Sequence, residues 1–269
     1  MSKASIWIII AVGLAGCCIG FKEFVWFMAV GYGLAISAIA VTLCIMGIVT
    51  GAAGIPFLLM CAVLFIYGLR LGLFLLIREK KSDSYRKTLA STGSVTKMSL
   101  PISISMWIMC SVLYMMMTSP LYFRIENLSG GLAGSGNVCM WIGAVISALG
   151  VITEAVSDAQ KSAQKKENPQ MVATKGLFSL CRCPNYFGEI TVWTGVLISG
   201  LPILRGFWQW FLAIIGYICI VAIMFSGAKR LELRQTKRCW KMKEYVDYAN
   251  HTPLIIPFLP IYHMIDWRQ

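Results

Sequence analysis

The sequence has little charge. Only 13% of its 269 residues are charged, about half the fraction usual in soluble globular domains, whereas 58% are hydrophobic. The mean hydropathy is +0.71, and long stretches hold almost no charged residue. This composition excludes an ordinary soluble globule, a disordered chain and a small secreted module held together by disulfides. The chain is therefore predicted to be a polytopic membrane protein.

Negative charge is scarcer than positive charge, because only 12 Asp and Glu residues accompany 24 Lys and Arg residues, for a net charge of +12. In a soluble protein this excess would suggest a nucleic-acid partner. In a membrane protein, basic residues gather in the cytoplasmic loops instead. Membrane lipids are therefore the expected surroundings, and no nucleic acid is expected to bind.

A membrane span needs about 20 apolar residues, and seven stretches of the sequence are candidates. The first and the sixth are short, so each could be tilted, partly buried or re-entrant. The expected fold class is all-α, with about seven transmembrane helices. The predicted spans are Ser5–Gly20, Phe24–Val49, Ile55–Ile77, Leu100–Tyr122, Val138–Ser157, Tyr186–Leu201 and Phe207–Ser226.

The basic residues lie mostly on one side of these spans. Of the 24 Lys and Arg residues, 20 lie at Lys22, in the loops of residues 78–97 and 158–182, and in the tail of residues 229–269. By the positive-inside rule, the N-terminus is expected outside and the C-terminal tail in the cytoplasm.

The N-terminus allows a second interpretation. Leu14-Ala15-Gly16-Cys17 follows a short apolar run and resembles a bacterial lipoprotein signal with its lipidated cysteine. Cleavage there would leave six spans and export the basic loop of residues 78–97. Because that outcome contradicts the charge bias, a genuine first span is favoured.

One charge lies deep inside a predicted span. Arg70 is roughly 12 Å along the helix from Arg78 at the expected cytoplasmic end. A charge at this depth costs a few kcal/mol unless it is paired or hydrated, so Arg70 is a candidate site residue. Tyr67 shares its helix face by spacing. The structural alternative is an arginine that snorkels to the surface beside an interior aromatic ring.

The fifth predicted span ends in a polar face. Glu154, Asp158 and Lys161 stack on one side of the helix near the expected cytoplasmic end. They could form a solvated, salt-bridged helix end, which would contribute little stability. Asp158 is the better functional candidate of the three, because it would lie against the motif that follows.

That motif, Gly176–Glu189, predicts the start of a helix. Pro184 suits the first helical position, and Asn185 and Glu189 then share one face. The free N–H groups of the helix start, with Arg182 beside them, form an anion site suited to a phosphate-bearing ligand. A capped helix with a snorkelling carboxylate is the structural alternative.

Histidine is rare, and this argues against a metal. Cys181 and Cys183 form a C-x-C pair, but no second pair follows, and His251 and His263 are the two histidines of the chain. Structural zinc usually takes four ligands, so no metal site is expected.

Together, these motifs resemble a known family. Their order is E-x-x-x-D-x-Q-K, then G-L-F-x-x-x-R-x-P-N-Y-F-G-E, then L-E-x-R, then Y-x-x-Y in the basic tail. This order is similar to the steroid 5-alpha-reductase C-terminal-domain family, most of all its prokaryotic branch. The resemblance covers roughly residues 67–260 and is strongest over residues 150–260.

The resemblance implies a single membrane domain over residues 1–269 that reduces a lipid with NADPH. The hydride would go to an activated carbon–carbon double bond, typically an enone of a steroid-like lipid that enters from the bilayer. Residues 1–150 would form the lipid-substrate side, and residues 151–269 the cofactor half, with its pocket open to the cytoplasm. The oligomeric state stays open.

Site residues follow from the resemblance by position. Tyr67 would be the acid that polarises the substrate carbonyl, and Arg70 would line the substrate pocket. Asp158 and Arg182 would serve the adenosine and phosphate parts of NADPH. The full set expected to bind the cofactor is Asp158, Lys161, Arg182, Asn185, Tyr186, Glu189, Arg234, Tyr245 and Tyr248.

Two departures from the family pattern affect the expected chemistry. Cys181 and Cys183 replace the serine and histidine of the family's S-R-H-P-N-Y motif. The second span, Phe24–Val49, has no carboxylate to partner the tyrosine, and Glu23 lies at its mouth. A 3-oxo-4-ene steroid is therefore one of several possible substrates.

Two other functions remain as alternatives. Membrane methyltransferases of the isoprenylcysteine or phospholipid type share an R-x-P-x-Y helix start and a basic tail, but they bind S-adenosylmethionine. A non-catalytic lipid-binding protein is the second alternative. No G-x-G-x-x-G motif follows a strand, so a Rossmann cofactor site is not expected.

Overall fold

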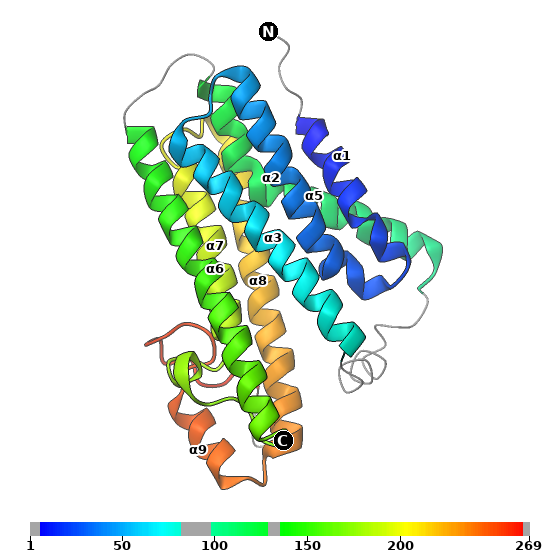
Figure 1. Ribbon diagram of the computed structural model, residues 1–269, viewed down its shortest axis with the longest axis vertical. Coiled ribbons are helices and arrows are strands. Elements are labelled where there is room, and N and C mark those ends of the chain that lie inside the picture. Colours follow the sequence, from blue (N-terminus) through cyan, green and yellow to red (C-terminus); the bar gives the residue numbers. More distant parts are fainter. Residues whose placement is uncertain (1–5, 82–97, 129–134, 266–269) are drawn as a thin grey trace. The chain divides into compact units, whose positions relative to one another are not determined.

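In the computed structural model, residues 6–81, 98–128 and 135–265 are described, and all their regular structure is helical (Figure 1). The all-α prediction is therefore confirmed for this part of the chain. The helices are α1 (Ile6–Cys17), η1 (Cys18–Phe21), η2 (Phe24–Met28), α2 (Val30–Thr50), α3 (Ile55–Lys81), α5 (Leu100–Leu128), α6 (Ser135–Glu167), η3 (Gly176–Ser179), α7 (Pro184–Gly200), α8 (Gly206–Cys239) and α9 (Lys243–His251).

Among the described residues, five helical stretches are long and apolar enough to cross a membrane, as in a multi-pass membrane protein. α1 and α7 are shorter, with 12 and 17 residues. The count of seven spans and the outside N-terminus therefore remain predictions. Residues 82–97 of the predicted basic loop lie outside the described residues. The five stretches are Phe24–Thr50, Ile55–Ile77, Leu100–Leu128, Asn137–Glu167 and Gly206–Cys239.

The chain divides into two compact units. Unit 1 contains Met1–Val145 and Gly195–Tyr217, and unit 2 contains Ile146–Thr194 and Ile218–Gln269. The single membrane domain, with its substrate half and cofactor half dividing near residue 150, remains a prediction.

Small residues let the helices of unit 1 approach closely. A Cβ atom placed on Gly16 of α1 would lie 2.5 Å from the Cα of Ala35 in α2, so only glycine fits there. Trp107 of α5 donates its indole N–H to the carbonyl of Leu14 in α1 at 2.7 Å. Such contacts are typical of membrane helices, whose association depends on close packing rather than on the exclusion of water.

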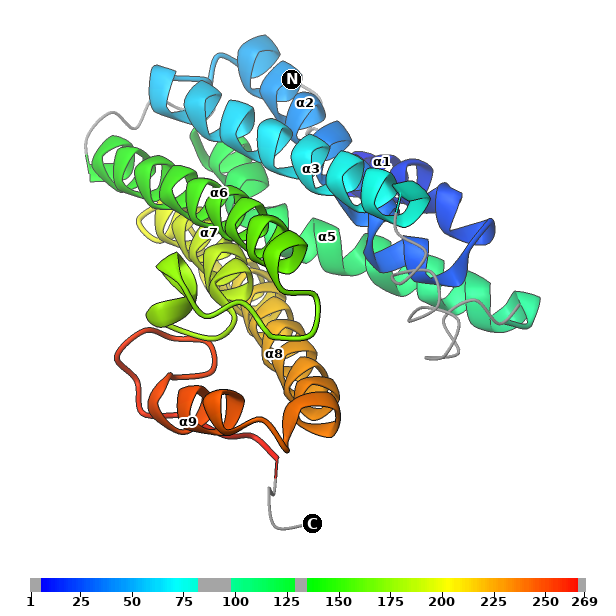
Figure 2. The same ribbon diagram turned by 60° about the horizontal axis from the view of Figure 1, so that its bottom comes forward.

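Unit 2 joins parts of α6, α7 and α8 to α9 and the C-terminal segment. Within it, α6 and α7 run side by side, and Figure 2 shows α9 and the segment that follows it. A Cβ on Gly150 of α6 would lie 2.6 Å from the carbonyl oxygen of Gly188 in α7. Ser147 donates its hydroxyl to the carbonyl of Val192 at 2.8 Å. This crossing determines where the polar groups of both helices lie.

Candidate functional site

In unit 1, the backbones of α2 and α3 touch beside two tyrosines. A Cβ on Gly33 would lie 2.4 Å from the carbonyl oxygen of Gly68, and one on Gly68 would lie 2.5 Å from that of Gly33. The neighbours of these glycines in the sequence are Tyr32 and Tyr67. Because the two backbones meet at the glycines, the two phenol rings are brought within reach of each other.

The tyrosine hydroxyls form a hydrogen bond of 2.9 Å, in which either oxygen can donate. The side chain of Tyr67 is fully buried and that of Tyr32 is 5% exposed. Their ring centroids are 6.2 Å apart at an interplanar angle of 78°. The predicted acid, Tyr67, therefore lies in an apolar interior with a second phenol on its hydroxyl. Arg70, partly buried, lies three residues further along α3.

Tyr32 was not among the predicted site residues. The second span has no carboxylate that could partner Tyr67. A signal was nevertheless present: Tyr32-Gly33-Leu34 is repeated as Tyr67-Gly68-Leu69, and in both cases a small residue stands four positions after the glycine. Matched small-x-x-x-small patterns on consecutive helices indicate a close crossing, and this one predicts adjacent tyrosines.

In unit 2, the α6–α7 crossing buries three of the predicted carboxylates. Glu154 and Asp158 of α6 are 3% and 8% exposed, and Glu189 of α7 is 6% exposed. A Cβ on Gly188, which precedes Glu189, would lie 2.9 Å from the backbone nitrogen of Glu154. These acidic groups therefore belong to the interior of the unit and do not form a solvated helix end.

Two glutamine side chains of α6 hold the loop that precedes α7. Gln160 accepts the N–H of Leu177 at 2.8 Å, next to Gly176, whose φ of +71° favours glycine. Gln164 accepts the N–H groups of Thr174 and Lys175 at 2.9 and 3.0 Å. The glutamine of the E-x-x-x-D-x-Q-K motif is thus a positioning residue for the motif that follows.

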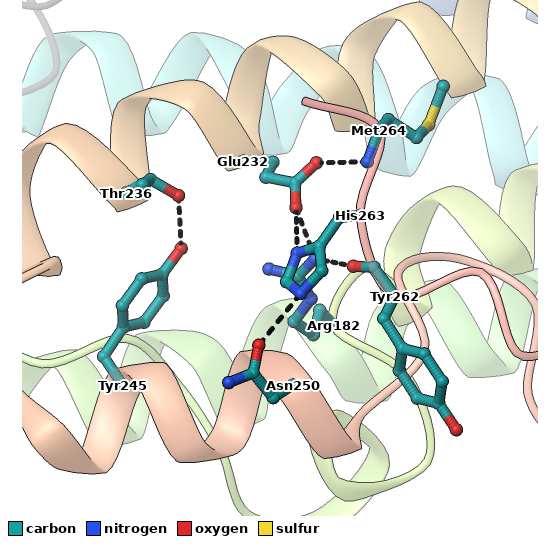
Figure 3. Close-up of polar contacts among 8 residues, drawn as sticks. All are labelled: Arg182, Glu232, Thr236, Tyr245, Asn250, Tyr262, His263 and Met264. Carbon is teal, nitrogen blue, oxygen red and sulfur yellow. Dashed lines mark hydrogen bonds and ion pairs between the residues drawn. The ribbon is translucent and has the colours of Figure 1, made fainter. Parts of the chain in front are cut away.

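Arg182 lies at the centre of a buried polar cluster (Figure 3). It is 3% exposed, and its Nη2 donates to Oε1 of Glu232 at 2.7 Å and to the carbonyl of Tyr262. His263 Nδ1 is 3.0 Å from the same Oε1, and Oε2 of Glu232 accepts the N–H of Met264 at 2.9 Å. The C-terminal segment therefore folds back onto α8, and Glu232 offsets the charge of Arg182.

Part of the Arg182 side chain makes no hydrogen bond to the described residues. Within the described residues, its Nε and Nη1 are buried without a hydrogen-bond partner, and so is Oδ1 of Asn185. α7 begins at Pro184, as the motif predicts. Two donors and one acceptor without partners therefore belong to residues that flank the start of this helix.

Basic side chains of α6 and α8 lie near the same helix start. Burial raises the pKa of the Cys183 thiol, and the nearby positive charge of Lys161 acts in the opposite direction. The charges of Arg234 and Arg230 oppose the effect of burial on the Tyr186 phenol in the same way. The ring of Tyr186 also packs beside Gly227 of α8. The predicted residues Lys161, Tyr186 and Arg234 thus occur in one neighbourhood of unit 2.

The two tail tyrosines hold α9 in place. Tyr248 donates its hydroxyl to the carbonyl of Phe178 at 2.6 Å, and the Tyr245 hydroxyl is 3.0 Å from that of Thr236. Burial raises the pKa of both phenols. Both hydroxyls therefore have partners within the protein, and their predicted contact with a cofactor remains a prediction.

Cys183, which stands where the similar family has histidine, is a neutral group. Cys181 and Cys183 are each 1% exposed, and burial raises the pKa of these thiols to about 11 and about 12. Neither is part of a group of three or more possible metal ligands within the described residues. At neutral pH, Cys183 therefore cannot supply the charge that a histidine could.

Comparisons with known proteins give a family. A family model described as "Protein of unknown function (DUF1295)" matches residues 20–252. An uncharacterized protein of Schizosaccharomyces pombe, C9.08c, is 29% identical over 114 residues, which are 38% of this chain and 36% of that protein. The chain thus spans about a third of the length of this curated relative. No solved structure matches. Because the family model covers most of its length, the chain belongs to the DUF1295 family.

Proposed function

We propose that this protein is an integral membrane reductase that uses NADPH to reduce a carbon–carbon double bond conjugated to a carbonyl in a steroid-like or other lipid. The motif resemblance to the steroid 5-alpha-reductase C-terminal-domain family supports this proposal. The resemblance is strongest over residues 150–260. The DUF1295 match, which ends at residue 252, covers most of this range.

The observation that carries the cofactor assignment is the set of polar atoms at the start of α7. Nε and Nη1 of Arg182 can donate to phosphate or carbonyl oxygens, and Oδ1 of Asn185 can accept from an amide or a hydroxyl. Buried polar atoms without partners are unfavourable, so a ligand with both acceptors and donors would stabilise this region. NADPH has both kinds of group, and when bound it supplies a hydride.

Charge decides which residues meet the phosphates. Glu232 already offsets the positive charge of Arg182. Arg182 therefore contributes directed hydrogen bonds, whereas Lys161 and Arg234 contribute most of the attraction for phosphate, together with the positive end of the α7 dipole. Asp158 would accept hydrogen bonds from the adenosine part, and Glu189 would order the pocket from the next turn of α7.

Tyr67 would donate the proton. A phenol is a weak acid in water, but in an apolar site its hydroxyl can stabilise the negative charge that develops on the carbonyl oxygen. Its full burial places the donating hydroxyl in such an apolar site. Arg70 would then help to orient the lipid in the same unit.

Ligand-dependent thermal stability of the protein purified in detergent tests the cofactor assignment. NADPH should raise the melting temperature, because a ligand that binds the folded state stabilises it. Asn185→Ala and Glu189→Ala should weaken this effect, and Glu244→Ala, at an exposed position on α9, should leave it unchanged. Stabilisation by S-adenosylmethionine alone would indicate the methyltransferase alternative. Stabilisation by neither ligand would favour the lipid-binding alternative.

A further inference from the structure

The hydrogen bond between Tyr32 and Tyr67 differs from the bonds that three other buried hydroxyls of unit 1 make. Ser37, Thr118 and Tyr114 donate to backbone carbonyls, which only accept. In the tyrosine pair, either oxygen can donate. The donor and acceptor of this bond can therefore exchange without movement of the backbone. A bond from a hydroxyl to a carbonyl cannot reverse in this way, because the carbonyl has no proton to donate.

The α2–α3 crossing holds this reversible pair in a fixed place. The close contact of Gly33 and Gly68 leaves no room for a Cβ at either position, so glycine at both positions allows the two backbones to meet here. Both phenols are at least nineteen-twentieths buried. A hydrogen bond in such a low-dielectric site is stronger than in water, and linked hydrogen bonds strengthen one another.

We propose that Tyr32 is the positioning residue for Tyr67 and that the two hydroxyls form a carbonyl-binding site without a carboxylate. This inference rests on the proposed function. With substrate bound, Tyr32 donates to Tyr67, which directs the Tyr67 O–H toward the carbonyl oxygen of the lipid. The site then selects an oxygen that accepts, such as that of a conjugated ketone.

The proton and electron balance follows from this arrangement. The β-carbon of the enone gains a hydride taken from NADPH, which leaves as NADP+, and the carbonyl oxygen gains the proton of Tyr67. The resulting enol tautomerises to the saturated ketone. Tyr32 stabilises the phenolate left on Tyr67 by its hydrogen bond until Tyr67 regains a proton from water. A hydrogen bond to a charged group changes an equilibrium or a rate by about 10- to 100-fold.

Steady-state kinetics on three single variants test the role of Tyr32. Tyr67→Phe should abolish enone reduction, and Tyr32→Phe should lower kcat about 10- to 100-fold, with a larger solvent isotope effect and an unchanged KM for NADPH. Tyr114→Phe is the matched control, since it removes a buried phenol hydroxyl that bonds to the Phe27 carbonyl. The double variant Tyr32→Phe/Tyr67→Phe should be no slower than Tyr67→Phe alone.

A binding measurement without NADPH gives a second readout. The probe is a conjugated trienone steroid, whose absorption band moves to longer wavelength when its carbonyl accepts stronger hydrogen bonds. The wild-type protein and Tyr114→Phe should shift the band equally, Tyr32→Phe should shift it less, and Tyr67→Phe least. Melting temperatures of all variants check that each one folds.

The outcomes separate this inference from the function on which it rests. If Tyr32→Phe behaves like Tyr114→Phe in both assays while Tyr67→Phe is inactive, the inference is wrong and the reductase proposal stands. If the wild-type protein binds NADPH but neither reduces a panel of lipid enones nor shifts the trienone band, both proposals fail.

Discussion

Removal of the Glu232 carboxylate should destabilise unit 2 strongly, because Arg182 would lose the charge that offsets its own. The side chain of Glu232 is completely buried and is in contact with Arg182, His263 and the N–H of Met264. Loss of one partner from a buried ion pair costs about 3–5 kcal/mol, since the other charge remains without compensation. Loss of the bond to the Met264 N–H adds about 1 kcal/mol.

These magnitudes translate into a measurable shift. For a chain of this size, 1 kcal/mol corresponds to about 2–4 °C, so Glu232→Ala should lower the melting temperature in detergent by roughly 10 °C. Glu244→Ala is the control, because it removes an exposed carboxylate from the first turn of α9 and should cost under about 1 kcal/mol. The C-terminal segment, which contains Phe258 and Tyr262, should also become a faster substrate for chymotrypsin in Glu232→Ala.

A double variant separates charge from packing. Arg182→Met/Glu232→Met removes both charges and keeps side chains of similar length, so it should melt above Glu232→Ala. The scaling above predicts that Glu232→Ala melts roughly 10 °C below Glu244→Ala. A difference within about 2 °C, together with cleavage of the C-terminal segment at the wild-type rate, would show that the ion pair does not hold this segment on α8.

Two further predictions concern packing and reactivity. Gly33→Ala places a Cβ 2.4 Å from the Gly68 carbonyl oxygen, so it should lower the free energy of unfolding by about 1–3 kcal/mol. The control Gly54→Ala, whose Cβ would have its nearest neighbour at 3.7 Å, should be nearly neutral. Equal melting temperatures of the two variants would show that α2 and α3 are not in contact. Burial raises the pKa of the Cys183 thiol to about 12. The fraction of Cys183 present as the reactive thiolate should therefore be very small at neutral pH and should rise only as the pH approaches 12. Mass spectrometry after N-ethylmaleimide treatment at pH 8 should therefore find Cys183 unmodified in the folded protein and modified after denaturation, and rapid labelling of Cys183 in the folded protein would show that this thiol is not buried.

Local patterns predicted much of the fold and part of the site. Apolar runs indicated the helices, and Pro184 marked the first residue of α7, because a residue without an N–H suits that position. These features depend on residues that are close together in the sequence.

Pairings between distant residues could not be predicted in the same way. Glu232 lies 50 residues after Arg182, and in the L-E-x-R motif the family resemblance implies a role for Arg234 and none for Glu232. Nothing local indicated that the segment around His263 returns to α8. Tyr32 acquires a role only because its neighbour Gly33 meets Gly68 across two helices. Such contacts depend on the folded arrangement, and one sequence does not state them.

Transfer of isotope from cofactor to lipid tests the proposed function most directly. The purified protein is incubated with NADPH that carries deuterium at the transferable position and with a panel of lipid enones, and the products are analysed by mass spectrometry. We expect one deuterium on the β-carbon of a saturated ketone from the wild-type protein, and none from Tyr67→Phe. Absence of deuterated product from every enone, with NADPH bound and the protein folded, would contradict the reductase proposal.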